Sequence, residues 1–420
     1  MKLYQRITAA AAALVMLSAT ACTTSPVSNK SSNTVDLVFS WWGNDARNQY
    51  TIEAIEQFEE LHPEIKVECS YSEWSGFETR NKVQMISDTE ADVMQINFGW
   101  LDTYSKDGLG YYDINELTDT FQIDNFSQDV LEYGIKNDHL NAIPIAMNTE
   151  TVYINKTIYD KYGLEVPKTW DDLFAAAKVM QPDGIYPLSA AQKSMWLYLI
   201  TYTEQKQNKT LLRQNGTLNF TAEDFRVMIE FYQRLIDEGV MPQVEQYERL
   251  SLDNEVYAGS VAWVSDAKSY FGDAIENGRE IVCADYTTID GKDVGKGWYA
   301  KPATMYAVSK NTEHPKEAAM LLDFLMNSPE MASLQGIEKG IPLSTSAQAT
   351  IEEEGLLTGI QYDASQKMEG VTLGQLDPML ENSKLIDDFF AAANDIIYEV
   401  TTPEEGCAAF YEKITADYFN

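Results

Sequence analysis

The pattern of apolar and polar residues predicts alternating strands and helices from residue 35 onward. Residues 35–41 are apolar at every second position, which is typical of a strand with one buried face. Over 52–61 the apolar residues recur at helical spacing instead. The same alternation predicts strands at 65–71 and 92–97 and a helix at 77–87. Strands that alternate with helices of this length indicate βαβ units and a parallel sheet.

The second half of the chain continues this pattern less regularly. Thr169 and Asp172 have the spacing of a capping box, which predicts that a helix begins there. Further elements are expected as strands at 142–155, 256–265 and 301–309 and as helices at 218–238 and 315–326. After Pro342 the remaining residues are mostly of helical character.

Aromatic and polar residues gather where predicted strands end. In open parallel sheets, ligands bind beyond the carboxyl ends of the strands. The segments that follow the first three strands contain Trp42, Asn44, Asp45, Trp74, Asn97 and Trp100. We therefore interpret these six residues as candidate ligand contacts, with Trp74 in a polar loop. Asn44 and Asp45 have an alternative role as caps of the following helix, whereas Trp41 alternates to the opposite, core-facing side.

The first 22 residues have the features of an export signal. Lys2 and Arg6 precede an uncharged apolar run over 7–21, which is shorter than the roughly 20 residues that span a membrane. Cys22 follows small residues and is similar to the lipidated Cys of a bacterial lipobox, although Ala19 stands where Leu is usual. We expect a lipoprotein, with a soluble exported protein as the alternative. Residues 23–34 are almost wholly polar and are expected to form a flexible tether.

Composition narrows the range of partners. The 420 residues suffice for two domains, and 45% of them are hydrophobic. The net charge of −34 argues against nucleic acid and against polyanionic ligands. It suits a neutral or cationic ligand, although the charge can equally serve solubility alone. Beyond Cys22 the chain has Cys69, Cys283 and Cys407, of which Cys69 is expected in the core; we expect no disulfide.

Four stretches of the chain resemble a known family. They are WWGNDARNQYTIEAIEQFEELHPEIKV, ADVMQINFGWLDTYSKDG, IPIAMNTETVYINKTIYDKYGLEVPKTWDDL and MYAVSKNTEHPKEAAMLLDFLMNSPE. In this order they are similar to the extracellular solute-binding proteins of family 1, the sugar-binding components of ABC importers. The resemblance extends from residue 35 to about 420.

The resemblance implies an α/β fold with two lobes, of the periplasmic-binding-protein type II and similar in plan to maltose-binding protein. A ligand cleft would lie between the lobes, at hinge crossings near 146–149, 298–302 and 336–342. The expected first lobe is 35–146 plus 300–338, and the expected second lobe is 147–299 plus 339–420. The protein would be a monomer that captures a neutral oligosaccharide and delivers it to the permease, touching the membrane only through its anchor.

Sugar recognition needs aromatic rings for the sugar faces and polar groups for the hydroxyls. The family's positions add Asn148 at a crossing and Asp266 in a second-lobe loop as polar contacts. Trp196 and Trp298 are expected as further stacking platforms, whereas the apolar neighbours of Trp263 favour a core position. Arg47 and Lys268 are weaker candidates, with surface pairing as the alternative.

No catalytic or metal-binding motif is recognisable. The three histidines lack zinc spacing, and we find no nucleophile elbow, P-loop or dinucleotide fingerprint. We therefore expect neither an enzyme nor a cofactor or metal. Two alternatives stay open: an exported glycoside hydrolase, because 65 acidic residues make some carboxylate pair inevitable, and the same fold with a polyamine, metal or phosphate as ligand.

Overall fold

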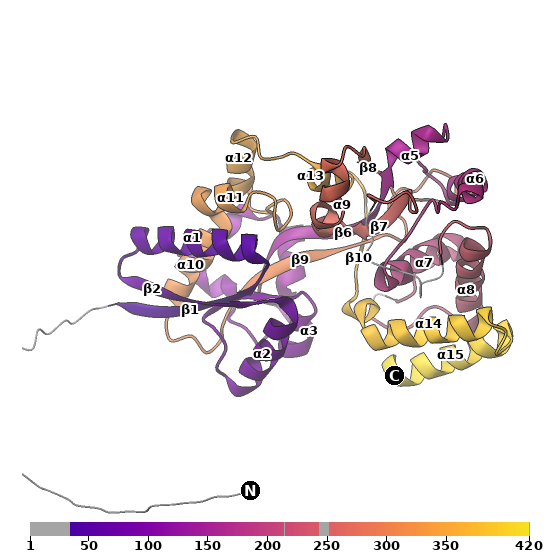
Figure 1. Cartoon of the computed structure of the whole chain (residues 1–420). Coiled ribbons are helices and arrows are strands. Elements are labelled where there is room, and N and C mark those ends of the chain that lie inside the picture. The colour runs from indigo at the N-terminus through magenta and orange to yellow at the C-terminus, as the bar shows by residue number, and fades with distance from the viewer. Residues whose placement is uncertain (1–33, 214, 243–251, 420) are drawn as a thin grey trace, which may run out of the picture.

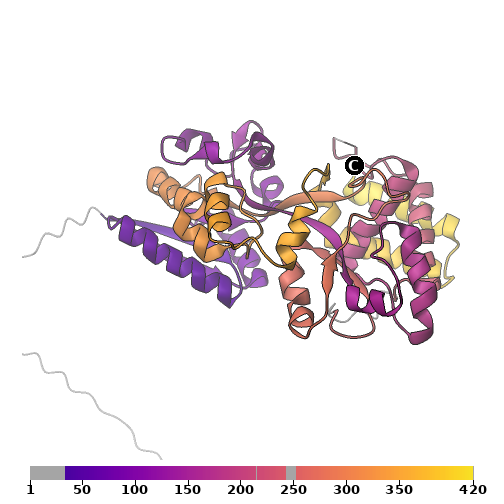
Figure 2. The same ribbon diagram turned by 90° about the horizontal axis from the view of Figure 1, so that it is seen from above.

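The computed structural model describes residues 34–213, 215–242 and 252–419, and it has two lobes. One lobe holds the N-terminal strands and the other holds the C-terminal helices, as Figure 1 and the view from above in Figure 2 both show. A sheet with the strand order β2-β1-β3-β9-β6-β7 runs through both lobes. The two-lobed α/β fold that the resemblance implied is therefore present.

The predicted strands are found close to their expected positions. They are β1 (Val35–Trp42), β2 (Ile65–Ser72), β3 (Val93–Ile96), β6 (Ile143–Asn155), β7 (Gly259–Trp263) and β9 (Tyr299–Val308). Four short strands were not predicted: β4 (Ile135–Lys136), β5 (His139–Leu140), β8 (Ile281–Cys283) and β10 (Gly374–Gln375). As predicted, β1 pairs in parallel with β2 and β3. The sheet is mixed beyond these three strands. Strands β9 and β6 run in opposite directions between the lobes and pair antiparallel with each other, β9 pairs antiparallel with β3, and β6 pairs antiparallel with β7.

Helices cover the sheet in both lobes. Those around the first lobe are α1 (Asp45–Leu61), α2 (Trp74–Ser87), α3 (Trp100–Tyr104), α4 (Gln128–Leu131), α10 (Pro315–Asn327), α11 (Pro329–Gln335) and α12 (Thr345–Glu353). Those of the second lobe are α5 (Lys156–Lys161), α6 (Trp170–Met180), α7 (Gln192–Gln207), α8 (Ala222–Asp237), α9 (Ala267–Glu276), α13 (Ile360–Gln366), α14 (Ser383–Ile397) and α15 (Pro403–Tyr418). The predicted capping box is confirmed, since Thr169 and Asp172 cap α6 reciprocally.

Each lobe has its own hydrophobic core. The first-lobe core includes Phe39 and Trp41, both fully buried as the alternation of β1 predicted for Trp41. The core of the second lobe is larger and is built from α6, α7, α8, α14 and α15 around β7. Cys69 is only half-buried on β2 instead of lying in the core, because its face of the strand is partly open. Cys69, Cys283 and Cys407 are all free thiols.

Three segments join the lobes. Strands β6 and β9 cross side by side, with Met147 opposite Pro302 and Asn148 opposite Lys301. The third segment follows α11, where Gly340 adopts a φ of 101° and a Cβ there would lie 2.6 Å from the Cβ of Ala146. This position therefore requires glycine, because a side chain would force the third segment away from β6.

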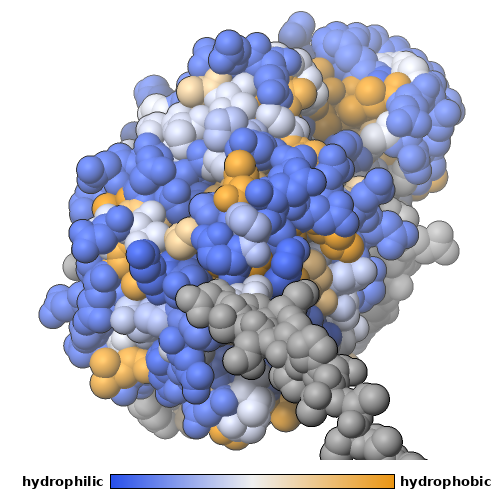
Figure 3. Space-filling model, turned by 90° about the vertical axis from the view of Figure 1, so that its left-hand side faces the viewer, coloured by the Kyte–Doolittle hydropathy of each residue, from blue (hydrophilic) through white to orange (hydrophobic). Residues whose placement is uncertain are grey.

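The surface is strongly polar. Figure 3 looks onto the end of the first lobe, where hydrophilic residues dominate and apolar ones form small separate patches. Among the residues that the structure describes, no helix is long and apolar enough to cross a membrane. The expected signal, Cys22 and the tether up to residue 33 lie outside the described residues.

Candidate ligand-binding groove between the lobes

A groove of about 830 Å³ lies between the two lobes. Its first-lobe wall consists of α2, α3 and the end of β3, and its other wall consists of a 3-10 helix, η7 (Pro378–Glu381), and the start of α14. The two walls approach each other closely at Gly99, where an added Cβ would lie 3.6 Å from the Cβ of Pro378. Both the position between lobes and the volume are typical of ligand sites.

Three tryptophans and a phenylalanine form one aromatic cluster on the first-lobe wall. The ring centroids of Trp42 and Trp74 are 4.9 Å apart, and the ring of Trp74 stacks on that of Trp100 at 5.8 Å with an interplanar angle of 16°. Phe77 lies beneath Trp42 and Trp100. Trp74 remains 37% exposed, whereas Trp100 is 7% exposed. The structure thus brings together the three tryptophans that follow the predicted strands.

Trp74 does not lie in a loop, as the sequence suggested, but is the first residue of α2. This start places Trp74, Glu78 and Lys82 at four-residue intervals, so their side chains share one face of the helix. Glu78 and Lys82 line the groove. The exposed ring of Trp74 therefore lies at the groove's edge.

The polar candidates of the first lobe have different surroundings. Asn97 lines the groove, and its Oδ1 accepts a hydrogen bond of 2.9 Å from the backbone N–H of Gly99. Asn44 is the N-cap of α1 and accepts a 2.9 Å hydrogen bond from the backbone N–H of Arg47. Asp45 lies exposed in the first turn of the same helix. The alternative role as a cap therefore describes Asn44, whereas Asp45 is the first residue of α1.

Asn148 and Asp266 lie where β6 enters the second lobe. Asn148 Nδ2 donates to the hydroxyl of Ser265 at 2.9 Å, and its Oδ1 accepts from the backbone N–H of Ser265 at 3.1 Å. Burial raises the pKa of the Asp266 carboxyl, a shift that the nearby Arg47 guanidinium opposes. Because Arg47 belongs to α1, this electrostatic contact connects the two lobes.

A cluster of charged residues lies beside Asp266 and was missed by the sequence analysis. The Nζ of Lys301 is 2.5 and 2.6 Å from the two carboxylate oxygens of Glu381, and Lys193 pairs with the same carboxylate. Both ammonium groups also face the ring of Trp263, at 4.6 Å for Lys301 and 5.7 Å for Lys193. We call Lys193, Lys301 and Glu381 the floor triad, since Glu381 lines the groove.

The charges of the floor triad and burial shift the pKa values of Glu381, Lys301 and the neighbouring Glu150 in different directions. Burial opposes ionisation of Glu381, but the ammonium groups of Lys301 and Lys193 lower the pKa of its carboxyl. Burial lowers the pKa of Lys301 despite its ion pair. Beneath them, burial raises the pKa of Glu150 to about 7, although Ser194 donates a hydrogen bond to it.

Glu338 joins the third crossing segment to both lobes. Its carbonyl oxygen accepts a 2.9 Å hydrogen bond from the Arg47 guanidinium of the first lobe. Its carboxylate pairs with Lys268 of α9 in the second lobe. Lys268 thus forms an ion pair with a surface carboxylate. Such pairing was the alternative to a ligand contact in the sequence analysis.

Trp196 and Trp298 are not brought to the groove, so their expected role as stacking platforms is not supported here. Trp196 is 1% exposed, and its indole N–H donates to the carbonyl of Leu380 at 3.0 Å. Trp298 is 3% exposed and donates to the carbonyl of Thr287 at 3.1 Å. Both rings lie in the second-lobe core, because their indole N–H groups find backbone partners there. Trp263, expected in the core, is buried except for 9% beneath the two lysines.

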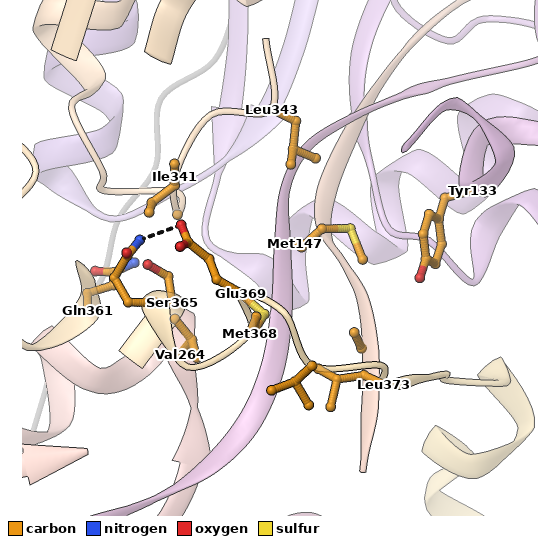
Figure 4. A pocket seen from close by; sticks show the side chains of 14 residues that line it. Tyr133, Met147, Val264, Ile341, Leu343, Gln361, Ser365, Met368, Glu369 and Leu373 are labelled. Atoms are coloured by element: carbon orange, nitrogen blue, oxygen red, sulfur yellow. Dashed lines mark hydrogen bonds between the residues drawn. The ribbon is translucent and has the colours of Figure 1, made fainter. Parts of the chain in front are cut away.

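A second cavity of about 360 Å³ lies on the other face of the crossing strands. Figure 4 shows Met147, Ile341 and Leu343 around it, together with Tyr133 of the first lobe. Along β6, Met147 and Asn148 are consecutive and therefore point to opposite faces. This cavity shares no lining residue with the groove. Among the described residues, no three His, Cys, Asp or Glu side chains gather as a metal site.

The comparisons with known proteins agree on one family. Residues 42–332 match the family described as bacterial extracellular solute-binding protein. An uncharacterized ABC transporter extracellular-binding protein of Pyrococcus horikoshii is 22% identical over 90% of this chain and 86% of its own length. The multiple sugar-binding protein of Streptococcus mutans is 22% identical over 86% of this chain and 87% of its own length.

Solved structures have the same fold. The periplasmic oligogalacturonide-binding protein of Yersinia enterocolitica, in complex with saturated digalacturonic acid, is 30% identical over 90% of this chain and 97% of its own, with a TM-score of 0.79. A structure described as a de novo designed esterase also matches, at 30% identity, with a TM-score of 0.82 over 90% of this chain and 97% of its own.

Proposed function

The chain belongs to the bacterial extracellular solute-binding protein family, and from this premise we propose that it captures an oligosaccharide for a carbohydrate ABC importer. The groove between the lobes is the proposed binding site. Its contacts would be Trp42, Trp74, Trp100 and Asn97 in the first lobe. Asn148 and Asp266, together with the floor triad, would contribute from the crossings and the second lobe.

The aromatic cluster is the observation that carries this proposal. An exposed tryptophan costs solubility unless it serves contact with a partner, and stacked indoles at a groove suit the apolar face of a sugar ring. Polar residues line the remainder of the groove and can meet hydroxyl groups. The related proteins include a multiple sugar-binding protein and an oligogalacturonide-binding protein, which supports a carbohydrate over the other solutes considered.

We further propose that the lobes close on the ligand about the three crossing segments. The first lobe would comprise 35–146 and 300–338, as expected from the resemblance, and the second 147–299 with the C-terminal part. Helix α12 was expected in the second lobe, but we assign it to the first lobe because it contacts α10 and α11. Closure by hinge bending is usual for binding proteins of this kind. The monomeric protein would then deliver its sugar to the permease.

Attachment to the outer face of the membrane through a lipidated Cys22 remains part of the proposal. The polar segment 23–34 would act as the tether. The family is one of substrate-binding proteins, and we propose that this member does not hydrolyse its ligand.

A thermal-shift screen followed by calorimetric titration tests the proposal. The purified chain 23–420 is mixed with a panel of neutral and acidic oligosaccharides of two to four residues, and a sugar that binds only the folded state raises Tm. Amino acids, polyamines and glycerol phosphate serve as non-sugar controls. Binding of a non-sugar alone would contradict the proposal, as would release of cleaved sugar at catalytic stoichiometry.

A further inference from the structure

The floor triad places two ammonium groups on one carboxylate. Lys193 comes from the first turn of α7, Lys301 from the crossing strand β9 and Glu381 from η7. The side chains of Lys301 and Glu381 are 11% and 17% exposed, whereas that of Lys193 is 42% exposed. With all three groups ionised, the triad carries one net positive charge, and Glu381 is its member that lines the groove.

A half-buried excess charge favours a counter-charge, because low-dielectric surroundings solvate it poorly. The ring of Trp263 offers its negative face to both ammonium groups, but a ring carries no net charge. The nearest further carboxyls are Glu150 and Asp266, which interact with the same lysines. Burial raises the pKa of both, so ionisation of either one is costly.

Glu150 is the more deeply buried of these two groups. It is 4% exposed, its Oε1 has no hydrogen-bond partner among the described residues, and its pKa is raised to about 7. The charged groups around it are Lys193 of α7, Lys301 of β9 and Glu381 of η7. Near neutral pH it therefore supplies only part of the missing negative charge.

From this arrangement we propose that the groove selects an acidic oligosaccharide and receives a sugar carboxylate at Lys193 and Lys301. The inference rests on the proposed function, since it assigns a substrate class to the same groove. One sugar ring would stack on the aromatic cluster while the carboxylate of the same or a neighbouring ring reaches the floor triad. Lys193 offers free N–H donors for this contact, because its side chain is the most exposed of the three.

The net negative charge of the whole chain by itself predicts a neutral or cationic ligand. For a ligand in the groove, however, the positive charge of the floor triad has the larger effect because it is closer. At physiological ionic strength, exposed charges are largely screened beyond about 8 Å. The 65 acidic residues are spread over the molecule, whereas the two ammonium groups lie within 6 Å of one indole ring. Of the other charged residues that line the groove, Glu78 and Lys82 balance each other in charge and Asp102 pairs with Lys136. A carboxylate that reaches the floor triad therefore interacts mainly with Lys193 and Lys301.

Calorimetric titration with three disaccharides of one length tests this inference: digalacturonic acid, the neutral digalactoside and a sulfated digalactoside. Wild-type protein is expected to bind digalacturonic acid at least tenfold more tightly than the neutral sugar. Lys193→Gln should weaken that binding about tenfold, as expected for the loss of one charge-assisted hydrogen bond, and should weaken it more than it weakens binding of the neutral sugar. Lys66→Gln is the matched control, since Lys66 pairs with Glu59 on the first-lobe surface.

A pH series separates a ligand carboxylate at the triad from a general effect of charge. Bound carboxylate should favour protonated Glu150, so affinity for digalacturonic acid should rise from pH 8 to pH 6 in the wild type. Glu150→Gln, which keeps the shape of the side chain, should remove this dependence. Melting curves of every variant confirm that the protein tested is folded.

Each outcome decides between the two proposals. Equal or tighter binding of the neutral sugar would overturn the acidic-ligand inference and leave the proposed function intact. Unchanged affinity in Lys193→Gln would overturn the role of the floor triad, and preference for the sulfated sugar would overturn the choice of carboxylate. Absence of binding to any sugar by folded protein would overturn the proposed function itself.

Discussion

Replacement of Trp74 by Ala should weaken sugar binding while the protein stays folded. The ring is 37% exposed and contacts Trp42 at 4.9 Å and Trp100 at 5.8 Å. Each aromatic pair contributes about 0.5–1.5 kcal/mol beyond area burial, so the loss of both pairs should lower the free energy of unfolding by about 1–3 kcal/mol. A central aromatic contact to a ligand is worth about 2 kcal/mol, and its loss raises Kd about thirtyfold.

Trp298→Ala is the matched comparison, because it removes the same ring from a core position. Trp298 is 3% exposed, packs on Tyr198 and Tyr286, and donates to the carbonyl of Thr287. A buried Trp→Ala change costs about 3–5 kcal/mol, and the unpaired carbonyl adds about 1–3 kcal/mol. Its folded fraction should nevertheless bind sugar with nearly unchanged affinity.

The assay combines calorimetric titration with a melting curve for each variant. We expect Trp74→Ala to change Kd with a small shift in Tm and Trp298→Ala to lower Tm by about 5–10 °C. Trp298→Phe provides the affinity measurement if the Ala variant does not fold. The reverse pattern, with Kd sensitive to Trp298 and insensitive to Trp74, would refute the assignment of the aromatic cluster to the site.

Three further predictions concern stability, motion and location. Burial raises the pKa of Glu204 to about 7. The folded state therefore holds a proton that the unfolded state releases above pH 4.5, so the free energy of unfolding should fall as pH rises from 4.5 to 7. Glu204→Gln should reduce the difference in Tm between pH 6 and pH 8. Small-angle scattering should show a smaller radius of gyration with saturating sugar, and an unchanged radius despite confirmed binding would contradict lobe closure. Cys22→Ser should move the protein from the membrane fraction to the medium, and retention on the membrane would contradict the lipid anchor.

Local patterns were sufficient for most elements of the fold. The alternation over 35–41 predicted β1 and the burial of Trp41, because a strand places successive side chains on opposite faces. The capping box at Thr169 predicted the start of α6, since it depends on residues only three apart. Helix α7 was missed, because it is buried on nearly all sides and so lacks an amphipathic period.

The candidate site was predicted only where it depends on the ends of neighbouring strands. Trp42 and Trp100 meet because parallel strands end at one edge of the sheet, a relation that the order of elements implies. Trp196 and Trp298 show the limit of this reasoning. Their sequence neighbours are compatible with a surface or a core position, and burial is decided by the residues that pack against them from elsewhere in the chain.

The sequence by itself determined the family, the alternation of strands and helices and the aromatic residues that follow the first strands, since these depend on short-range periodicity and on ordered motifs. Only the tertiary structure decided which charges meet. Lys193 and Glu381 are 188 residues apart, and Lys301 and Glu381 are 80 apart. Their encounter depends on how α7, β9 and η7 pack around Trp263. Composition averages such charges over the whole chain, whereas a ligand responds to the few within about one Debye length.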